Sequence, residues 1–160
     1  LEHLDEWVIR HNPDIVHLNA GLHDIARDPG PGPTTRVPLA EYHDNLERIV
    51  ATIQEKTRAR IILSTTTPVD LDRQHAVDYG INRINADVLD YNKAMREIAA
   101  RGKAVIHDLH KVVVQHGVQK MLEQDGVHFT DEAKVILGKA VAAAILLESA
   151  DASPSPKYQK

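Results

Sequence analysis

Apolar and polar positions alternate along this chain with two different periods. Short apolar runs rich in β-branched residues, at residues 14–19, 60–64 and 104–106, are typical of buried strands. Longer stretches, in which apolar side chains recur every three to four residues, predict amphipathic helices. These stretches are residues 1–11, 39–57, 82–100 and 110–123, and a last one that Thr130 caps and that runs to about Glu148.

This alternation of strand and helix predicts the α/β fold class. The strands would be parallel and joined by helical crossovers, in a three-layer α/β/α arrangement with helices on both faces of the sheet. The chain has 160 residues, of which 42% are hydrophobic. This is enough to form one hydrophobic core, and a chain of this length is not expected to form two. We therefore expect one domain over residues 1–148, followed by a disordered Ser/Pro-rich tail over residues 149–160.

Two long segments without regular periodicity separate the predicted elements. Residues 22–38 contain a proline–glycine alternation at 29–33 that excludes regular structure, and residues 65–82 form a second loop. Both follow directly on a strand end, where open α/β sheets place their ligands. Three arginines in these loops could bind a charged substrate group, or they could simply be solvent-exposed residues of connecting loops: Arg27, Arg36 and Arg73.

The composition excludes several partners and chemistries. Nineteen Lys and Arg against 23 Asp and Glu give a net charge of −4, so nucleic acid and anionic membrane surfaces are not expected partners. The longest apolar run, residues 140–147, is far shorter than the roughly 18 to 20 residues that a membrane-spanning helix needs. The chain has no cysteine, which excludes disulfides and thiol catalysis. We expect a soluble protein.

Histidine is abundant, with ten residues. His107 and His110 bracket Asp108 at a predicted strand end, which leaves a His/Asp metal site open as one interpretation, although nothing in the sequence fixes the geometry of these side chains. Ordinary surface and loop positions account better for most of the ten histidines. We expect neither a metal nor another cofactor.

An Asp and a His lie three residues apart, across a glycine turn, before the last predicted helix: Asp125 and His128. At this spacing the carboxylate can accept a hydrogen bond from one imidazole nitrogen and leave the other nitrogen free as a general base. Such a pair is two-thirds of a hydrolytic triad. Taken alone, the motif is a weak signal that also fits a simple turn in which His128 is an incidental loop residue.

The order and spacing of three segments resemble the SGNH (GDSL-type) hydrolases. The segments are residues 16–24 (VHLNAGLHD), residues 61–68 (IILSTTTP) and residues 125–130 (DGVHFT), so the resemblance covers about residues 1–147. It implies a flavodoxin-like parallel sheet in the order 2-1-3-4-5, of which this chain would supply only the last three strands. It also implies that Asp125 orients His128, that His128 is the catalytic base, and that Gly21 helps to bind the oxyanion.

The sequence departs from the family pattern at two places. His23 stands where the family usually has the oxyanion-hole Asn; an imidazole N–H can donate in its place, and the alternative is that His23 packs or caps locally. The family's nucleophilic Ser lies in a Gly-Asp-Ser motif upstream of the segment that contains Gly21, where this chain has no serine. Ser64 follows a predicted strand, but it matches a position that the family uses structurally.

The resemblance implies a serine esterase or deacylase that acts on small acyl esters, with O-acetylated carbohydrate as a family-level expectation and with the nucleophile upstream of residue 1. The alternative is a catalytically inactive SGNH-like module that binds a ligand or a partner. In either case one edge of the strand at residues 14–19 is left unpaired. We expect a missing N-terminal segment, a second copy of the chain or a swapped element to cover this edge.

Overall fold

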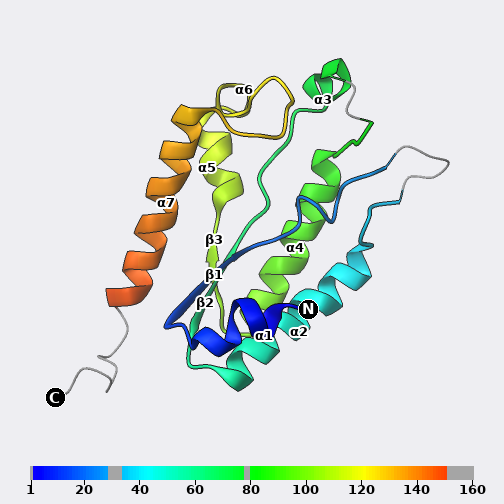
Figure 1. The fold of residues 1–160 in the computed structure, drawn as a ribbon. Helices are drawn as coiled ribbons and strands as arrows, with labels where there is room; N and C mark the ends of the chain where they lie inside the picture. The colour runs from blue at the N-terminus through cyan, green and yellow to red at the C-terminus, as the bar shows by residue number, and fades with distance from the viewer. Residues whose placement is uncertain (1, 29–33, 78–79, 151–160) are drawn as a thin grey trace.

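The computed structural model describes residues 2–28, 34–77 and 80–150, and Figure 1 shows their arrangement. The strands are β1 (Ile15–Asn19), β2 (Arg60–Ser64) and β3 (Val105–His107). The helices are α1 (Leu4–Trp7), the 3₁₀ helix η1 (Ile9–His11), α2 (Leu39–Lys56), α3 (Leu71–Val77), α4 (Asn85–Arg101), α5 (Leu109–His116), α6 (Val118–Met121) and α7 (Asp131–Ala150).

The three strands form one parallel sheet in the order β1-β2-β3. The register aligns Val16 with Ile61 and Leu63 with Ile106. Each crossover between neighbouring strands contains a helix, as parallel strands require. The α/β fold class predicted from the alternation of apolar patterns is therefore confirmed.

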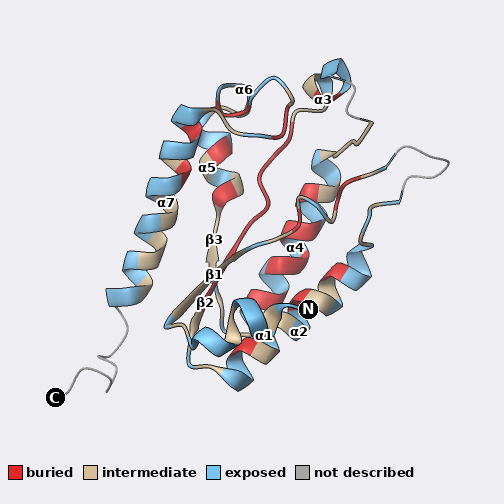
Figure 2. Ribbon diagram, viewed as in Figure 1, coloured by how far each residue is buried: buried red, intermediate tan, exposed pale blue. Residues whose placement is uncertain are grey.

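The first face of the sheet packs against α2 and α4. Val16 and Leu18 of β1 and Leu63 of β2 point to this face, because alternate side chains of a strand lie on opposite sides. Both helices turn a buried stripe toward them, coloured red on α4 in Figure 2. The buried residues of the two stripes include Leu46, Val50, Ile53, Val88, Met95 and Ile98. This cluster is the larger of the two cores.

The second face lies on the side of α5 and α7 (Figure 1). A smaller apolar cluster joins these two helices, with Val113 of α5 and Leu137 of α7 among its buried members. Arg60 of β2 forms an ion pair of 2.7 Å with Glu148 near the end of α7, which attaches this helix to the sheet. Three large apolar side chains of α7 remain exposed: Val135, Leu146 and Leu147.

Three predicted elements differ from the structure. The segment 65–82, expected as a loop, contains the helix α3. The helix expected over residues 110–123 is divided into α5 and α6 at Gly117, whose φ of +89° does not continue a helix. The helix expected over residues 1–11 is divided into α1 and η1, and it ends at Asn12 in the left-handed region.

The last helix begins and ends close to the predicted residues. The Thr130 hydroxyl accepts a hydrogen bond of 3.2 Å from the backbone N–H of Ala133, so the predicted cap is present. The helix continues to Ala150, two residues beyond the predicted domain end. The rest of the expected tail, 151–160, lies outside the described residues, as does the proline–glycine alternation at 29–33.

Among the helices of the described ranges, none combines the length and the apolar content that crossing a lipid bilayer requires. Strand β1 lies at one edge of the sheet, with β2 on its only paired side in the described part of the chain. The unpaired edge of β1, which we expected another segment or a second chain to cover, is therefore present among the described residues.

Candidate active site

Asp125 and His128 form the hydrogen-bonded pair that their spacing predicts. His128 Nδ1 lies 2.5 Å from Asp125 Oδ2. The His128 side chain is 78% exposed, whereas the Asp125 side chain is only 13% exposed. The carboxylate is thus held inside the turn, and the imidazole projects into solvent with Nε2 directed away from its partner. A general base needs this arrangement, because the free nitrogen must reach a reacting group.

Backbone amides hold the Asp125 carboxylate in place. Its Oδ1 accepts hydrogen bonds of 2.9 Å from the N–H groups of Val127 and His128. Burial raises the pKa of Asp125, but the hydrogen bonds from the His128 ring and from these two amides outweigh burial, so the pKa lies below its usual value. Asp125 therefore stays ionised, which is the state that orients an imidazole.

The turn that carries this pair lies against the start of α3. Gly126 has a φ of +70°, and a Cβ at this position would lie 2.2 Å from the backbone oxygen of Asp70. The Asp70 N–H donates to the Gly126 carbonyl at 2.9 Å. Arg73 Nη1 donates to the carbonyls of Leu122 and Glu123, at 2.8 and 3.2 Å. The segment that follows β2 thus holds the turn from outside, and the close approach of Asp70 requires a glycine at position 126.

Gly21 follows the end of β1 and is buried, with a φ of +128°. A Cβ here would lie 2.2 Å from Thr66 Oγ1, which itself donates to the Ala20 carbonyl at 2.8 Å. The buried Asn92 side chain holds Thr66 through both backbone groups, with distances of 2.7 and 2.8 Å. The backbone at Gly21 is therefore rigidly placed at the carboxyl end of the sheet.

His23 lies two residues further along this loop and is exposed. Within the described ranges its ring makes no hydrogen bond or ion pair, so the imidazole is not used as a local cap. Arg83 contacts this loop, because its Nε donates to the Leu22 carbonyl at 2.7 Å. Burial lowers the pKa of Arg83 and the charge of Arg36 lowers it further, while the Asp125 carboxylate opposes this lowering. Gly21 packs against Thr66 and Gly126 packs against Asp70, and both contacts are with the segment that follows β2, so the two predicted halves of the site lie at the same end of the sheet.

Ser64 and the His107 region have structural roles. Ser64 is fully buried, and its Oγ lies 3.4 Å from the His107 carbonyl oxygen. Asp108 caps α5 through the Lys111 N–H and binds Arg96 Nη2 at 2.7 Å. In the part of the chain that the structure describes, no group of three or more His, Asp and Glu side chains is placed to hold a metal ion.

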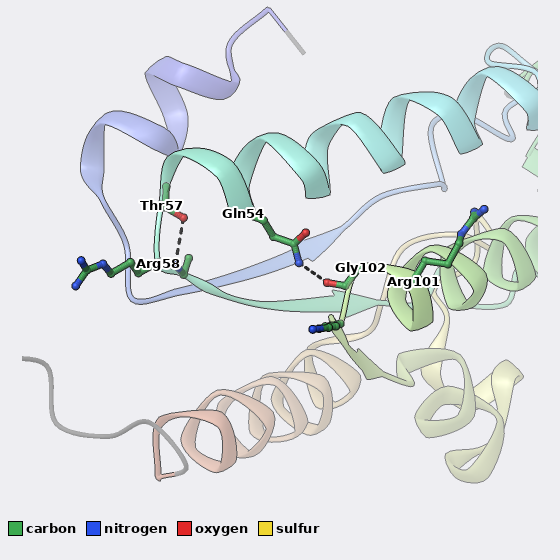
Figure 3. Close-up of a pocket in the computed structure, with 7 residues that line it drawn as sticks. Gln54, Thr57, Arg58, Arg101 and Gly102 are labelled. Atoms are coloured by element: carbon green, nitrogen blue, oxygen red, sulfur yellow. Dashed lines mark hydrogen bonds between the residues drawn. The ribbon is translucent and has the colours of Figure 1, made fainter.

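A hollow of about 420 Å³ lies at the opposite, amino end of the sheet (Figure 3). Residues that precede β2 and β3 line it, among them Arg58 and Lys103, and the Gln54 amide donates to the Gly102 carbonyl at its floor. Because the Asp125 turn contacts the segment after β2, this hollow is separate from the candidate site.

A sequence model of the GDSL-like Lipase/Acylhydrolase family matches residues 1–134. The chain belongs to this family. The resemblance to SGNH (GDSL-type) hydrolases is therefore confirmed. A search of curated proteins returned no match.

Several solved structures share the fold of this chain. A lipase/acylhydrolase from Enterococcus faecalis has 24% identity and a TM-score of 0.75, over 92% of this chain and 68% of that one. An acetylxylan esterase from Geobacillus stearothermophilus has 23% identity and a TM-score of 0.68, over 90% and 64%. A GDSL-like lipase from Bacteroides thetaiotaomicron has 20% identity and a TM-score of 0.68, over 92% and 69%. This chain thus spans about two-thirds of these structures.

The loop arginines singled out from the sequence all have internal partners. Arg27 forms a bidentate pair with Asp87, with both distances 2.9 Å, and Arg36 forms one with Asp28 at 2.8 and 2.5 Å. Arg73 holds the Asp125 turn. Sequence reasoning missed Arg83, which lies in a segment with no motif, and only its contact with the distant Leu22 draws attention to it.

Proposed function

We propose that this GDSL-like acylhydrolase is a serine esterase or deacylase for small acyl esters, with His128 as general base and Asp125 as its orienting carboxylate. One observation carries the proposal: a partly buried, ionised carboxylate holds Nδ1 of an imidazole that is otherwise 78% exposed. A histidine held in this way has one defined tautomer and one free nitrogen.

The nucleophile is proposed to come from a serine that precedes residue 1. Two of the four serines of the chain are described: Ser64 is fully buried, and Ser149 Oγ donates to the Ile145 carbonyl in the last turn of α7. Neither serine is placed to reach Nε2 of His128. Neither of the two described serines is thus a candidate nucleophile, which supports the proposal of a serine that precedes residue 1.

The proposed reaction is acyl transfer to water. The serine oxygen attacks the ester carbonyl while His128 Nε2 takes its proton, and the carbonyl oxygen becomes an oxyanion. Collapse of this intermediate breaks the bond to the alcohol, which leaves with the proton from His128. A water molecule then attacks the acyl-enzyme in the same way and releases the carboxylic acid. Asp125 stabilises the imidazolium at both stages without accepting its proton.

The Gly21 loop is proposed to bind the oxyanion. The rigid backbone at Gly21 and the unengaged His23 ring lie at the carboxyl end of β1, and both are N–H donors. Preorganised donors of this kind act without reorganisation during the reaction. We extend the substrate proposal to O-acetylated carbohydrates, because acetylxylan esterases are among the structures that share the fold.

The test uses the coding sequence upstream of residue 1. The chain extended by that sequence is treated with a fluorophosphonate and assayed on 4-nitrophenyl acetate, beside His128→Ala and the control His116→Ala, which changes an exposed histidine of α5. We expect labelling and hydrolysis in the extended chain and in the control, and loss of hydrolysis in His128→Ala. No labelling and no turnover would instead favour the catalytically inactive binding module.

A further inference from the structure

Arg83 lies between α3 and α4, and the buried Gln74 side chain forms hydrogen bonds with its backbone. The Gln74 amide accepts from the Arg83 N–H at 2.9 Å and donates to the Arg83 carbonyl at 3.0 Å. Gln74 is only 2% exposed. When both the oxygen and the nitrogen of a buried amide side chain bond to the backbone of one residue, they fix the position of that residue.

The side chain of Arg83 is also held, but by a single contact. Its Nε donates to the Leu22 carbonyl at 2.7 Å. Over the described ranges, its two terminal nitrogens have no hydrogen-bond or ion-pair partner. Arg36, in contrast, is bound by a carboxylate through two nitrogens, and Arg73 binds two carbonyls and Asp70.

The charge of Arg83 is only partly compensated. Burial lowers the pKa of Arg83, the neighbouring Arg36 lowers it further, and the Asp125 carboxylate raises it, with a net lowering that leaves the guanidinium protonated at neutral pH. Asp125 is already occupied by three hydrogen bonds. A half-buried cation that lacks a bound carboxylate costs free energy, which an external anion would offset.

The position of Arg83 relates this anion site to the proposed chemistry. Leu22 lies between Gly21 and His23, the two proposed oxyanion donors, and Asp125 orients the proposed base. An anion bound to the terminal nitrogens of Arg83 would therefore lie next to the loop that carries the proposed oxyanion donors, within range of the charge of Asp125. The planar fork of a guanidinium matches a carboxylate, which it binds through two parallel hydrogen bonds.

Building on the ester hydrolysis proposed above, we propose that Arg83 binds a carboxylate carried by the substrate, so that the preferred substrates are small acyl esters with a negative charge near the ester bond.

The experiment measures binding to the 160-residue chain by NMR, with two probes that differ by one charge. Monomethyl succinate carries an ester and a carboxylate, and dimethyl succinate carries two esters and no charge. We expect the chain to bind the monoester at least about tenfold more tightly, as a hydrogen-bonded charge pair allows. The perturbed signals should be those of Leu22, His23 and the Arg83 side chain.

Three variants test the role of the guanidinium. Arg83→Gln should abolish the preference for the charged probe, and Arg83→Lys should retain part of it, because Lys keeps the charge but loses the fork. Arg48→Gln, which removes an exposed arginine of α2, is the control with the same charge change and should behave as the wild type. Thermal unfolding of each variant shows whether the fold is intact.

Equal binding of the two probes, no measurable binding of the monoester, or shifts at the hollow around Arg58 would overturn the anion site. None of these outcomes bears on labelling of the extended chain, so the esterase proposal survives or fails separately. A preference that disappears in Arg83→Gln supports the anion site even where the extended chain proves inactive.

Discussion

His17 Nε2 and His107 Nδ1 lie 3.0 Å apart and form a hydrogen bond that joins β1 to β3 across the second face of the sheet. The register explains how they meet: His17 pairs with Ile62 and His107 with Ser64, so both side chains point to the same face of the sheet. One nitrogen must donate and the other must accept. Two protonated rings cannot make this bond.

This pair predicts a loss of stability in mild acid. Burial lowers the pKa of both histidines, and His17 lowers that of His107 further, so both folded-state values lie below 6.5. The related stability is therefore complete above pH 6.5 and decreases as the pH falls below it toward the folded-state values. Urea unfolding at several pH values should show this decrease in the wild type and a smaller one in His17→Leu. The exposed His75→Leu is the control, and an unchanged pH dependence in His17→Leu would contradict the prediction.

Asp125→Asn should remove the carboxylate that orients His128. The His128 Nδ1 proton, which we expect as a low-field NMR signal in the wild type, should disappear from that region. In the active, extended chain the rate should fall by about 10⁴-fold, the loss typical of this change in a hydrolytic triad. Asp131→Asn, in the first turn of α7, is the control. An unaltered rate in Asp125→Asn would exclude the proposed orienting role.

Gly126→Ala should destabilise the chain by about 1–3 kcal/mol, because the left-handed backbone is strained for alanine and the new Cβ would meet Asp70. Gly138 offers a matched control. It lies in α7 with no atom within 4 Å of a new Cβ, so Gly138→Ala should stabilise the chain by about 0.5–1 kcal/mol. Thermal or urea unfolding measures both changes, and equal effects at the two glycines would be inconsistent with this account.

Arg73→Ala should destabilise the turn that carries Asp125 and His128. It removes hydrogen bonds to the carbonyls of Leu122 and Glu123, and we expect a cost of about 1–3 kcal/mol in the free energy of unfolding. Hydrogen exchange of the Gly126 and Val127 amides should accelerate, while the amides of β2 keep their protection. If exchange at the turn stays slow in Arg73→Ala, the arginine does not hold it.

The unpaired edge of β1 predicts association. Together with the exposed Val135, Leu146 and Leu147 of α7, it leaves apolar surface and strand hydrogen-bonding groups uncovered in the described residues. We expect the 160-residue chain to self-associate in size-exclusion chromatography and to become monomeric when extended by its upstream sequence. A stable monomer of the 160-residue chain would contradict the expectation that another segment or chain covers the edge of β1.

The sequence by itself determined the order of the three strands and of the longer helices, and the Asp125–His128 pair. Both depend on interactions within a few residues: apolar periodicity decides which segments become strands or helices, and a turn of three residues brings the carboxylate to the imidazole. The helix α3 was missed because its apolar pattern is too short to stand out from the loop around it.

Only the tertiary structure decided which partner each remaining side chain has. His17 and His107 are 90 residues apart, and Arg83 is 61 residues from Leu22. Such contacts depend on strand register and on the path of each crossover, which no local pattern encodes. For the same reason the three arginines chosen from the sequence proved to have internal partners, whereas Arg83, which no motif marks, contacts the Gly21 loop of the candidate site.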